Sequence, residues 1–132
     1  MPTQNPNWIS GGNINPKRFV TQQTDADLTV EESNATEMPV GVSGIGTKYA
    51  PIPEVTTNYH AESGDPVWVH GPGEECWLTA GGAVTAGDLL KPDNDGKGVT
   101  ATAGDKYGAR ALAAAASGED SRAYVMVGEL DT

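Results

Sequence analysis

The sequence predicts a mainly β fold, a small barrel or sandwich, and three observations carry this prediction. Short runs rich in β-branched and aromatic residues recur, such as PVWVH at 66–70 and CWLT at 76–79. Turn residues separate such runs at a spacing of about 8–12 residues, which is typical of small all-β domains. The chain also contains 9 prolines and 17 glycines. Because proline fixes φ and removes a backbone donor, long helices are disfavoured.

The chain has 132 residues, enough for one domain, and its apolar content is low. Leu, Ile, Val and Phe make up 22 residues, so we expect a small core. Contacts with other copies or with a partner would then complete this core. Lys and Arg total 8 against 18 Asp and Glu, a net charge of -10. This excess of acid argues against nucleic acid and membrane partners, because phosphates and anionic lipids bind clustered bases.

Residues 1–37 are predicted to form an extended N-terminal arm, and residues 38–132 the folded domain. The first stretch is rich in Asn, Gln, Pro and Gly without a period, and it carries isolated apolar pairs. We expect Trp8, Ile9, Phe19 and Val20 to anchor the arm on another protein. The alternative is a tail without anchors.

A β-hairpin with a long loop is predicted over Pro66–Thr79. The intervening His-Gly-Pro-Gly sequence is typical of a turn. In the first strand, Val67 and Val69 share one face, and Trp68 and His70 share the other.

A second hairpin is predicted from strands at Gly87–Lys91 and Gly98–Thr102. The Asp95-Gly96 pair favours a tight type I′ turn, which requires positive φ angles.

The C-terminal third is expected to add two strands. The alanine-rich stretch Tyr107–Ser117 predicts a strand near 108–112 and then a short helical turn, and the sequence does not decide whether Ala113–Ala116 are helical. Alternating apolar residues predict a last strand over Arg122–Val127.

The residues able to bind a metal or attack a substrate form no recognisable motif. His60, His70 and Cys76 lack the paired spacing of zinc ligands. Cys76 lies in an apolar run, where a thiol is normally inert. Lys91 stands where a calcium loop needs its first acid, so the hairpin explains that segment better. We therefore expect no catalytic residue, no metal or cofactor, and no small-molecule substrate.

Residues 80–128 contain four segments in a characteristic order: AVTAGDLLK at Ala83–Lys91, DGKGV at Asp95–Val99, ALAAAASGE at Ala111–Glu119 and YVMV at Tyr124–Val127. Together they resemble the capsid decoration (cement) proteins of tailed phages. The resemblance covers a little over a third of the chain, and its specificity lies in the order and spacing of these elements. One departure is Ala113, where the family often has Glu.

The resemblance implies a small β-barrel or β-tulip domain on the outer surface of the phage head. Proteins of this family bind the major capsid protein after the shell expands, as homotrimers at three-fold and quasi-three-fold positions. There they stabilise the shell against internal DNA pressure. The extended arm would reach over neighbouring capsid subunits.

Three aromatic residues and two rival functions remain open at this point. Trp68, Trp77 and Tyr124 are expected in the barrel core or at the trimer interface. One rival is another virion accessory domain, such as a fibre base or a head–tail component. The other is a small carbohydrate-binding module that uses Trp68, Trp77 and Tyr59 beside acidic residues.

Overall fold

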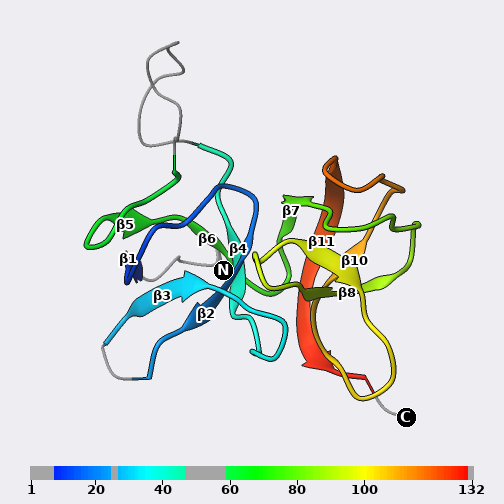
Figure 1. Ribbon diagram of the computed structural model, residues 1–132, viewed down its shortest axis with the longest axis horizontal. Coiled ribbons are helices and arrows are strands. Elements are labelled where there is room, and N and C mark those ends of the chain that lie inside the picture. Colours follow the sequence, from blue (N-terminus) through cyan, green and yellow to red (C-terminus); the bar gives the residue numbers. More distant parts are fainter. Residues whose placement is uncertain (1–7, 25–26, 47–58, 131–132) are drawn as a thin grey trace.

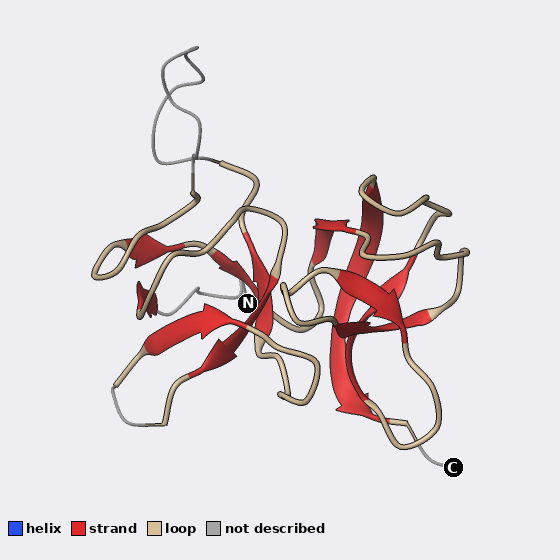
Figure 2. Ribbon diagram, viewed as in Figure 1, coloured by secondary structure: helices blue, strands red, loops and turns tan. Residues whose placement is uncertain are grey.

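The computed structural model describes residues 8–24, 27–46 and 59–130, which form eleven β-strands in two sheets (Figure 1). These described ranges contain no helix (Figure 2), so the predicted mainly β fold is confirmed. The strands are β1 (Trp8–Ser10), β2 (Phe19–Gln22), β3 (Thr29–Glu32), β4 (Gly41–Ser43), β5 (Pro66–Val67), β6 (Val69–His70), β7 (Glu75–Thr79), β8 (Leu89–Pro92), β9 (Gly98–Thr100), β10 (Lys106–Ala111) and β11 (Asp120–Glu129).

The first sheet closes on itself as a small barrel. Its strand order is β5-β1-β3-β2-β4-β6, and the two outermost strands are consecutive halves of the segment 66–70. One half pairs with β1 and the other with β4, and Trp68 lies between them. Val67 and Val69 point into the core, whereas Trp68 is 57% exposed, which confirms the predicted alternation.

The hairpin predicted over Pro66–Thr79 is wrong, because its two halves lie in different sheets. β6 pairs with β4, whereas β7 pairs with β11. The turn between them, in which Gly73 has a φ of 92°, redirects the chain from one sheet to the other. Each half thus finds its backbone partners in a strand distant in sequence.

The second sheet has the order β7-β11-β10-β8-β9 and nearly closes as well. A single parallel bridge between Ala80 and Gly98 joins the end of β7 to β9. The β8–β9 hairpin is confirmed, but its turn is not type I′. Gly96 alone in that turn has a positive φ, of 78°, and the Asp93 carboxylate accepts the N–H groups of Asp95 (2.8 Å) and Lys97 (3.0 Å).

The alanine-rich segment after β10 is not helical, so the predicted helical turn is wrong. Ala115 forms an isolated antiparallel bridge with Val84, with hydrogen bonds of 2.9 and 3.1 Å in the two directions. This pairing satisfies the backbone hydrogen-bonding groups of Ala115, and its small side chain packs in the core of the second barrel at 8% exposure. These tertiary contacts override the helix propensity of alanine. The last strand alternates as predicted, with Ala123 and Val125 fully buried.

The prediction of an extended arm is also corrected for the part of residues 1–37 that the structure describes. β1, β2 and β3 are strands of the first barrel, in the same sheet as β4. Phe19, Val20 and Val30 have no exposed surface. Because adjacent residues of a strand point to opposite faces, Val20 packs in the core of the first barrel and Phe19 in that of the second. Residues 1–7 lie outside the described residues.

Phe19, which comes from β2 of the first barrel, packs into the hydrophobic core of the second barrel. Its ring belongs to the buried cluster that includes Leu78, Leu90 and Val125 of the second sheet. Gly108 makes this packing possible, because a Cβ there would overlap Cγ of Pro39 and lie 2.7 Å from Cε1 of Phe19. The buried apolar residues thus form two clusters, one in each barrel, and Phe19 extends from the first barrel into the second cluster.

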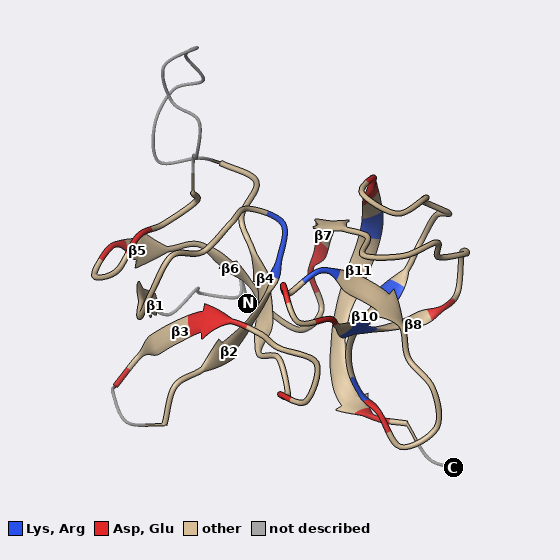
Figure 3. Ribbon diagram, viewed as in Figure 1, with Lys and Arg blue, Asp and Glu red and all other residues tan. Residues whose placement is uncertain are grey.

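Acidic residues outnumber basic residues in both barrels (Figure 3). In the described part of the first barrel, the basic residues are Lys17 and Arg18, both on the segment facing the second barrel. The second barrel carries the other described bases, which are Lys91, Lys97, Lys106, Arg110 and Arg122. Over the described residues each barrel has a net charge of -4, from six acids and two bases in the first barrel and nine acids and five bases in the second.

Candidate functional site

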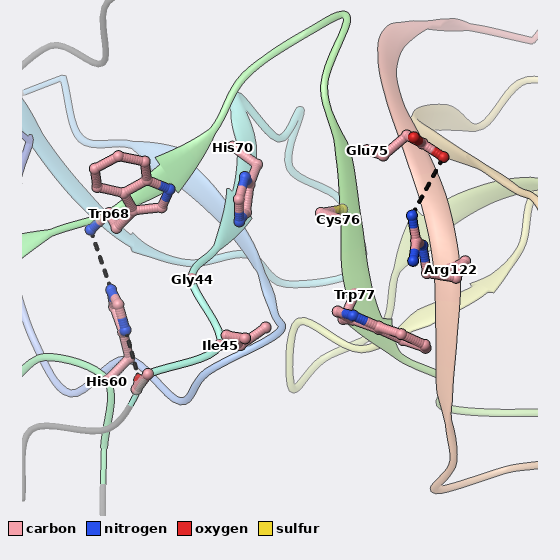
Figure 4. A pocket seen from close by; sticks show the side chains of 10 residues that line it. Gly44, Ile45, His60, Trp68, His70, Glu75, Cys76, Trp77 and Arg122 are labelled. Carbon is pink, nitrogen blue, oxygen red and sulfur yellow. Dashed lines mark hydrogen bonds and ion pairs between the residues drawn. The ribbon is translucent and has the colours of Figure 1, made fainter.

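A cleft of about 470 Å³ lies between the two barrels, a volume in the range of ligand-binding pockets (Figure 4). One wall comes from the end of β4 and from the segment 60–70, and the other comes from β7 and β11. The lining residues are Gly44, Ile45, Gly46, His60, Trp68, His70, Glu75, Cys76, Trp77 and Arg122.

His60 fixes the first wall. Its Nε2 accepts the backbone N–H of Trp68 at 3.1 Å, and its Nδ1 lies 2.7 Å from the carbonyl oxygen of Gly46. These two partners require the neutral tautomer with the proton on Nδ1. Gly44 completes the wall by donating its N–H to the Trp68 carbonyl at 2.8 Å. Trp68 and Ile45, at 57% and 60% exposure, are thereby held over the cleft.

The second wall is β7 with its neighbour on β11. The Arg122 guanidinium lies 5.2 Å from the centroid of the Trp77 ring, a cation–π contact, and 3.5 Å from Glu75. Both charged side chains are about half exposed, so this ion pair contributes little to stability.

Cys76 lines the cleft but is unsuited to nucleophilic chemistry. Burial, reinforced by the negative charge of Glu74, raises the pKa of its thiol to about 12. Because the thiolate is the reactive form, the thiol stays protonated and inert near neutral pH. Within the described residues, no group of three or more His, Cys, Asp and Glu side chains is placed to hold a metal ion.

None of the three aromatic residues expected in the core or at a trimer interface lies in the core. Trp68, Trp77 and Tyr124 are 57%, 39% and 40% exposed. Trp68 and Trp77 line opposite walls of the cleft, whereas Tyr124 lies on the outer face of the second sheet beside Leu112. Tyr59, grouped with the tryptophans by the carbohydrate hypothesis, does not line the cleft.

The four residues expected to anchor the arm differ in how far the structure buries them. Phe19 and Val20 are fully buried in the core and have no surface for another protein. Trp8 is partly buried against the core of the first barrel. Ile9 is 44% exposed, and its N–H bonds the carbonyl of Leu28, which is 47% exposed. Ile45 and Arg122 also line the cleft but were not predicted from the sequence. The signal available for Ile45 was its position between two glycines, and the signal for Arg122 was a basic residue in an alternating strand.

The described residues include no helix long and apolar enough to cross a membrane.

Comparison with known proteins identifies a fold rather than a family. No protein family model matches the chain, and no curated protein matches it. Among solved structures, it is similar to the crystal structure of the head fiber gp8.5 N base in bacteriophage phi29, with a TM-score of 0.64 and 16% sequence identity. The match covers 96% of each chain. It therefore includes the strands of residues 8–32 as well as the second barrel, and the two proteins share the whole two-barrel arrangement.

Proposed function

We propose that this chain is a non-enzymatic structural component of a tailed-phage virion that binds the outer surface of the head. The observation that carries the proposal is the fold similarity to the head fiber N base, over 96% of both chains. The motif resemblance of residues 80–128 to capsid decoration proteins points independently to the same location. A strongly acidic surface suits a partner that is protein rather than DNA.

We further propose that the chain acts as a trimer at three-fold and quasi-three-fold positions and stabilises the shell. The support is an exposed groove on the second sheet, lined by Arg110, Leu112, Tyr124 and Met126. Leu112 and Tyr124 are 43% and 40% exposed. Aromatic, Met and Arg side chains are enriched at protein interfaces. The basic Arg110 in this groove suits contact with acidic residues of a neighbouring copy.

The contact with the major capsid protein is assigned to the patch formed by Ile9 and Leu28. These neighbouring apolar side chains are 44% and 47% exposed on the first barrel. Phe19 and Val20 take no part in the contact, because they are buried.

The test is co-sedimentation of the purified protein with undecorated cognate heads, expanded and unexpanded, counting bound copies. Saturable binding to expanded heads at hundreds of copies is expected for a shell-stabilising protein. A handful of copies would indicate a fibre base or vertex component instead. Failure to bind either form would overturn the proposal.

Two variants separate the two surfaces. Ile9→Asp is expected to abolish head binding and leave the trimer intact, as measured by analytical ultracentrifugation. Leu112→Asp is expected to dissociate the trimer. Each variant is the control for the other. The assignment would be refuted if the two variants had the same effect on head binding and the same effect on the trimer.

A further inference from the structure

The cleft contains an open strand edge on β7. In the β7–β11 pair, opposite residues alternate between exchanging hydrogen bonds and not doing so. Val125 donates to the carbonyl of Glu74 and Ala80 donates to the carbonyl of Glu119, so the even-numbered residues of β7 are those bonded to β11. Glu75 and Trp77 therefore direct their N–H and C=O groups away from β11.

A second contact confirms that the odd-numbered residues of β7 direct their backbone groups away from β11. Thr79, two residues beyond Trp77, donates its N–H to the carbonyl of Lys17 at 3.0 Å, on the side away from β11. Lys17 in turn donates its N–H to the carbonyl of Gly44 at 3.3 Å. The Lys17 backbone thus bridges β7 to the segment after β4 and closes one end of the cleft.

Beyond Lys17 the edge is open. Within the described part of the chain, the Glu75 and Trp77 backbone groups that face the cleft have no backbone partner. Figure 4 shows β7 facing the segment that carries Gly44 and Ile45. Exposed edges are normally protected by charge, proline, a bulge or a covering loop. Here the open stretch carries the charged Glu75, and the exposed Ile45 and Trp68 stand opposite it.

We propose that this cleft binds an extended peptide segment of another protein, which pairs with β7 as an added strand. The free N–H and C=O groups of Glu75 and Trp77 recur every second residue, which is the hydrogen-bonding repeat of a partner strand. An apolar side chain of the peptide enters between Trp68, Ile45 and Trp77 and supplies the specificity. This inference does not depend on the virion role proposed above.

The geometry favours a peptide over a second copy of this chain. The open edge lies inside a cleft of about 470 Å³ with Ile45 and Trp68 on the opposite wall, a volume suited to a short peptide segment and too small for part of a second barrel. A neutral or basic segment with one β-branched or aromatic residue is the expected ligand.

The probe is a displayed library of random seven-residue peptides, selected on the wild-type protein and counter-selected on Ile45→Asp. Ile45 is 60% exposed, so this variant is expected to fold normally. An enriched peptide is then synthesised with and without an N-methyl group on the amide that faces β7. Methylation is expected to weaken binding about tenfold, since it removes one hydrogen bond and adds a steric clash. Methylation of the next amide along, which faces away from β7, is the matched control.

A second readout reports on the protein itself. On peptide binding, the Trp77 amide is expected to become protected from hydrogen exchange, whereas amides on β9 are not. The variant Glu75→Pro removes one edge N–H without breaking the β7–β11 ladder and is expected to weaken binding. Glu75→Ala keeps that N–H and is expected to bind normally.

Three outcomes would overturn the proposal. One is that no peptide is enriched on the wild-type protein relative to Ile45→Asp. Another is binding that is insensitive to N-methylation and leaves the Trp77 amide unprotected. The third is selective binding of an oligosaccharide from a glycan array, lost in Trp68→Ala and Trp77→Ala, which would make the cleft a carbohydrate site.

Discussion

Replacing Phe19 with alanine tests whether residues 8–22 are part of the core or a detachable arm. The ring is fully buried in the hydrophobic cluster that lies mainly within the second barrel. Loss of its transfer free energy accounts for about 1.5–3 kcal/mol. The cavity left behind adds to this, and a typical Phe-to-Ala change in a core costs about 3–5 kcal/mol in all. Pro39 and the Gly108 backbone beside the ring restrict collapse of the cavity, which favours the upper half of that range.

The assay is urea unfolding at fixed protein concentration, followed by fluorescence of the three tryptophans. The midpoint is expected to fall without a change in slope, and the melting temperature to drop by roughly 10 °C or more. Ile45→Ala, at an exposed position, is the control and is expected to shift stability by less than about 0.5 kcal/mol. A loss of less than about 1 kcal/mol for Phe19→Ala would place the ring outside the cooperative core and refute this reasoning.

Four further outcomes are expected. Gly108→Ala forces an overlap between the barrels and should cost about 1–3 kcal/mol in thermal unfolding, whereas Gly12→Ala, with open space around it, should cost far less; equal effects would contradict the packing. Leu28 has a φ of 52° and is 47% exposed, so Leu28→Asn should raise the melting temperature by relieving backbone strain, and a lower value would count against strain there. Cys76, whose pKa burial raises to about 12, should resist alkylation at about pH 8 until denaturant is added, as followed by mass spectrometry; rapid native labelling would disprove its burial. The pKa of Asp105 is lowered chiefly by the hydrogen bond that its carboxylate accepts from the Thr102 backbone N–H. The stabilisation from this carboxylate is complete above the ordinary Asp pKa and is lost as the pH falls through the lowered pKa. Asp105→Asn should therefore flatten the fall in melting temperature between about pH 5 and pH 3, and an unchanged slope would exclude this carboxylate as a source of acid sensitivity.

The candidate site was partly visible in the sequence. His60, His70, Cys76, Trp68 and Trp77 were singled out as residues able to carry chemistry or binding, and all five line the cleft. Their juxtaposition was not predictable, because the hairpin that would have joined the two tryptophan strands does not form. The tryptophans line the cleft from separate sheets, and the Lys17 backbone links those sheets.

The sequence by itself determined the local features of this protein. Alternation placed Val67 and Val69 on one face of the strand and Trp68 on the other, without deciding which face is buried, and the Asp-Gly pair located the β8–β9 hairpin. Such features depend on the two-residue period of a strand and on local turn conformation, which neighbouring residues specify.

Only the tertiary structure decided which strands pair and which apolar residues form the core. Phe19 and Val20, an apolar pair in a polar stretch, have the same pattern whether they dock on another protein or close a barrel. The choice depends on strands far away in sequence, since β2 pairs with β4 and the Phe19 ring packs beside Gly108. A strand's pattern specifies which face it buries and leaves its partner open, because backbone hydrogen bonds are the same for any sequence.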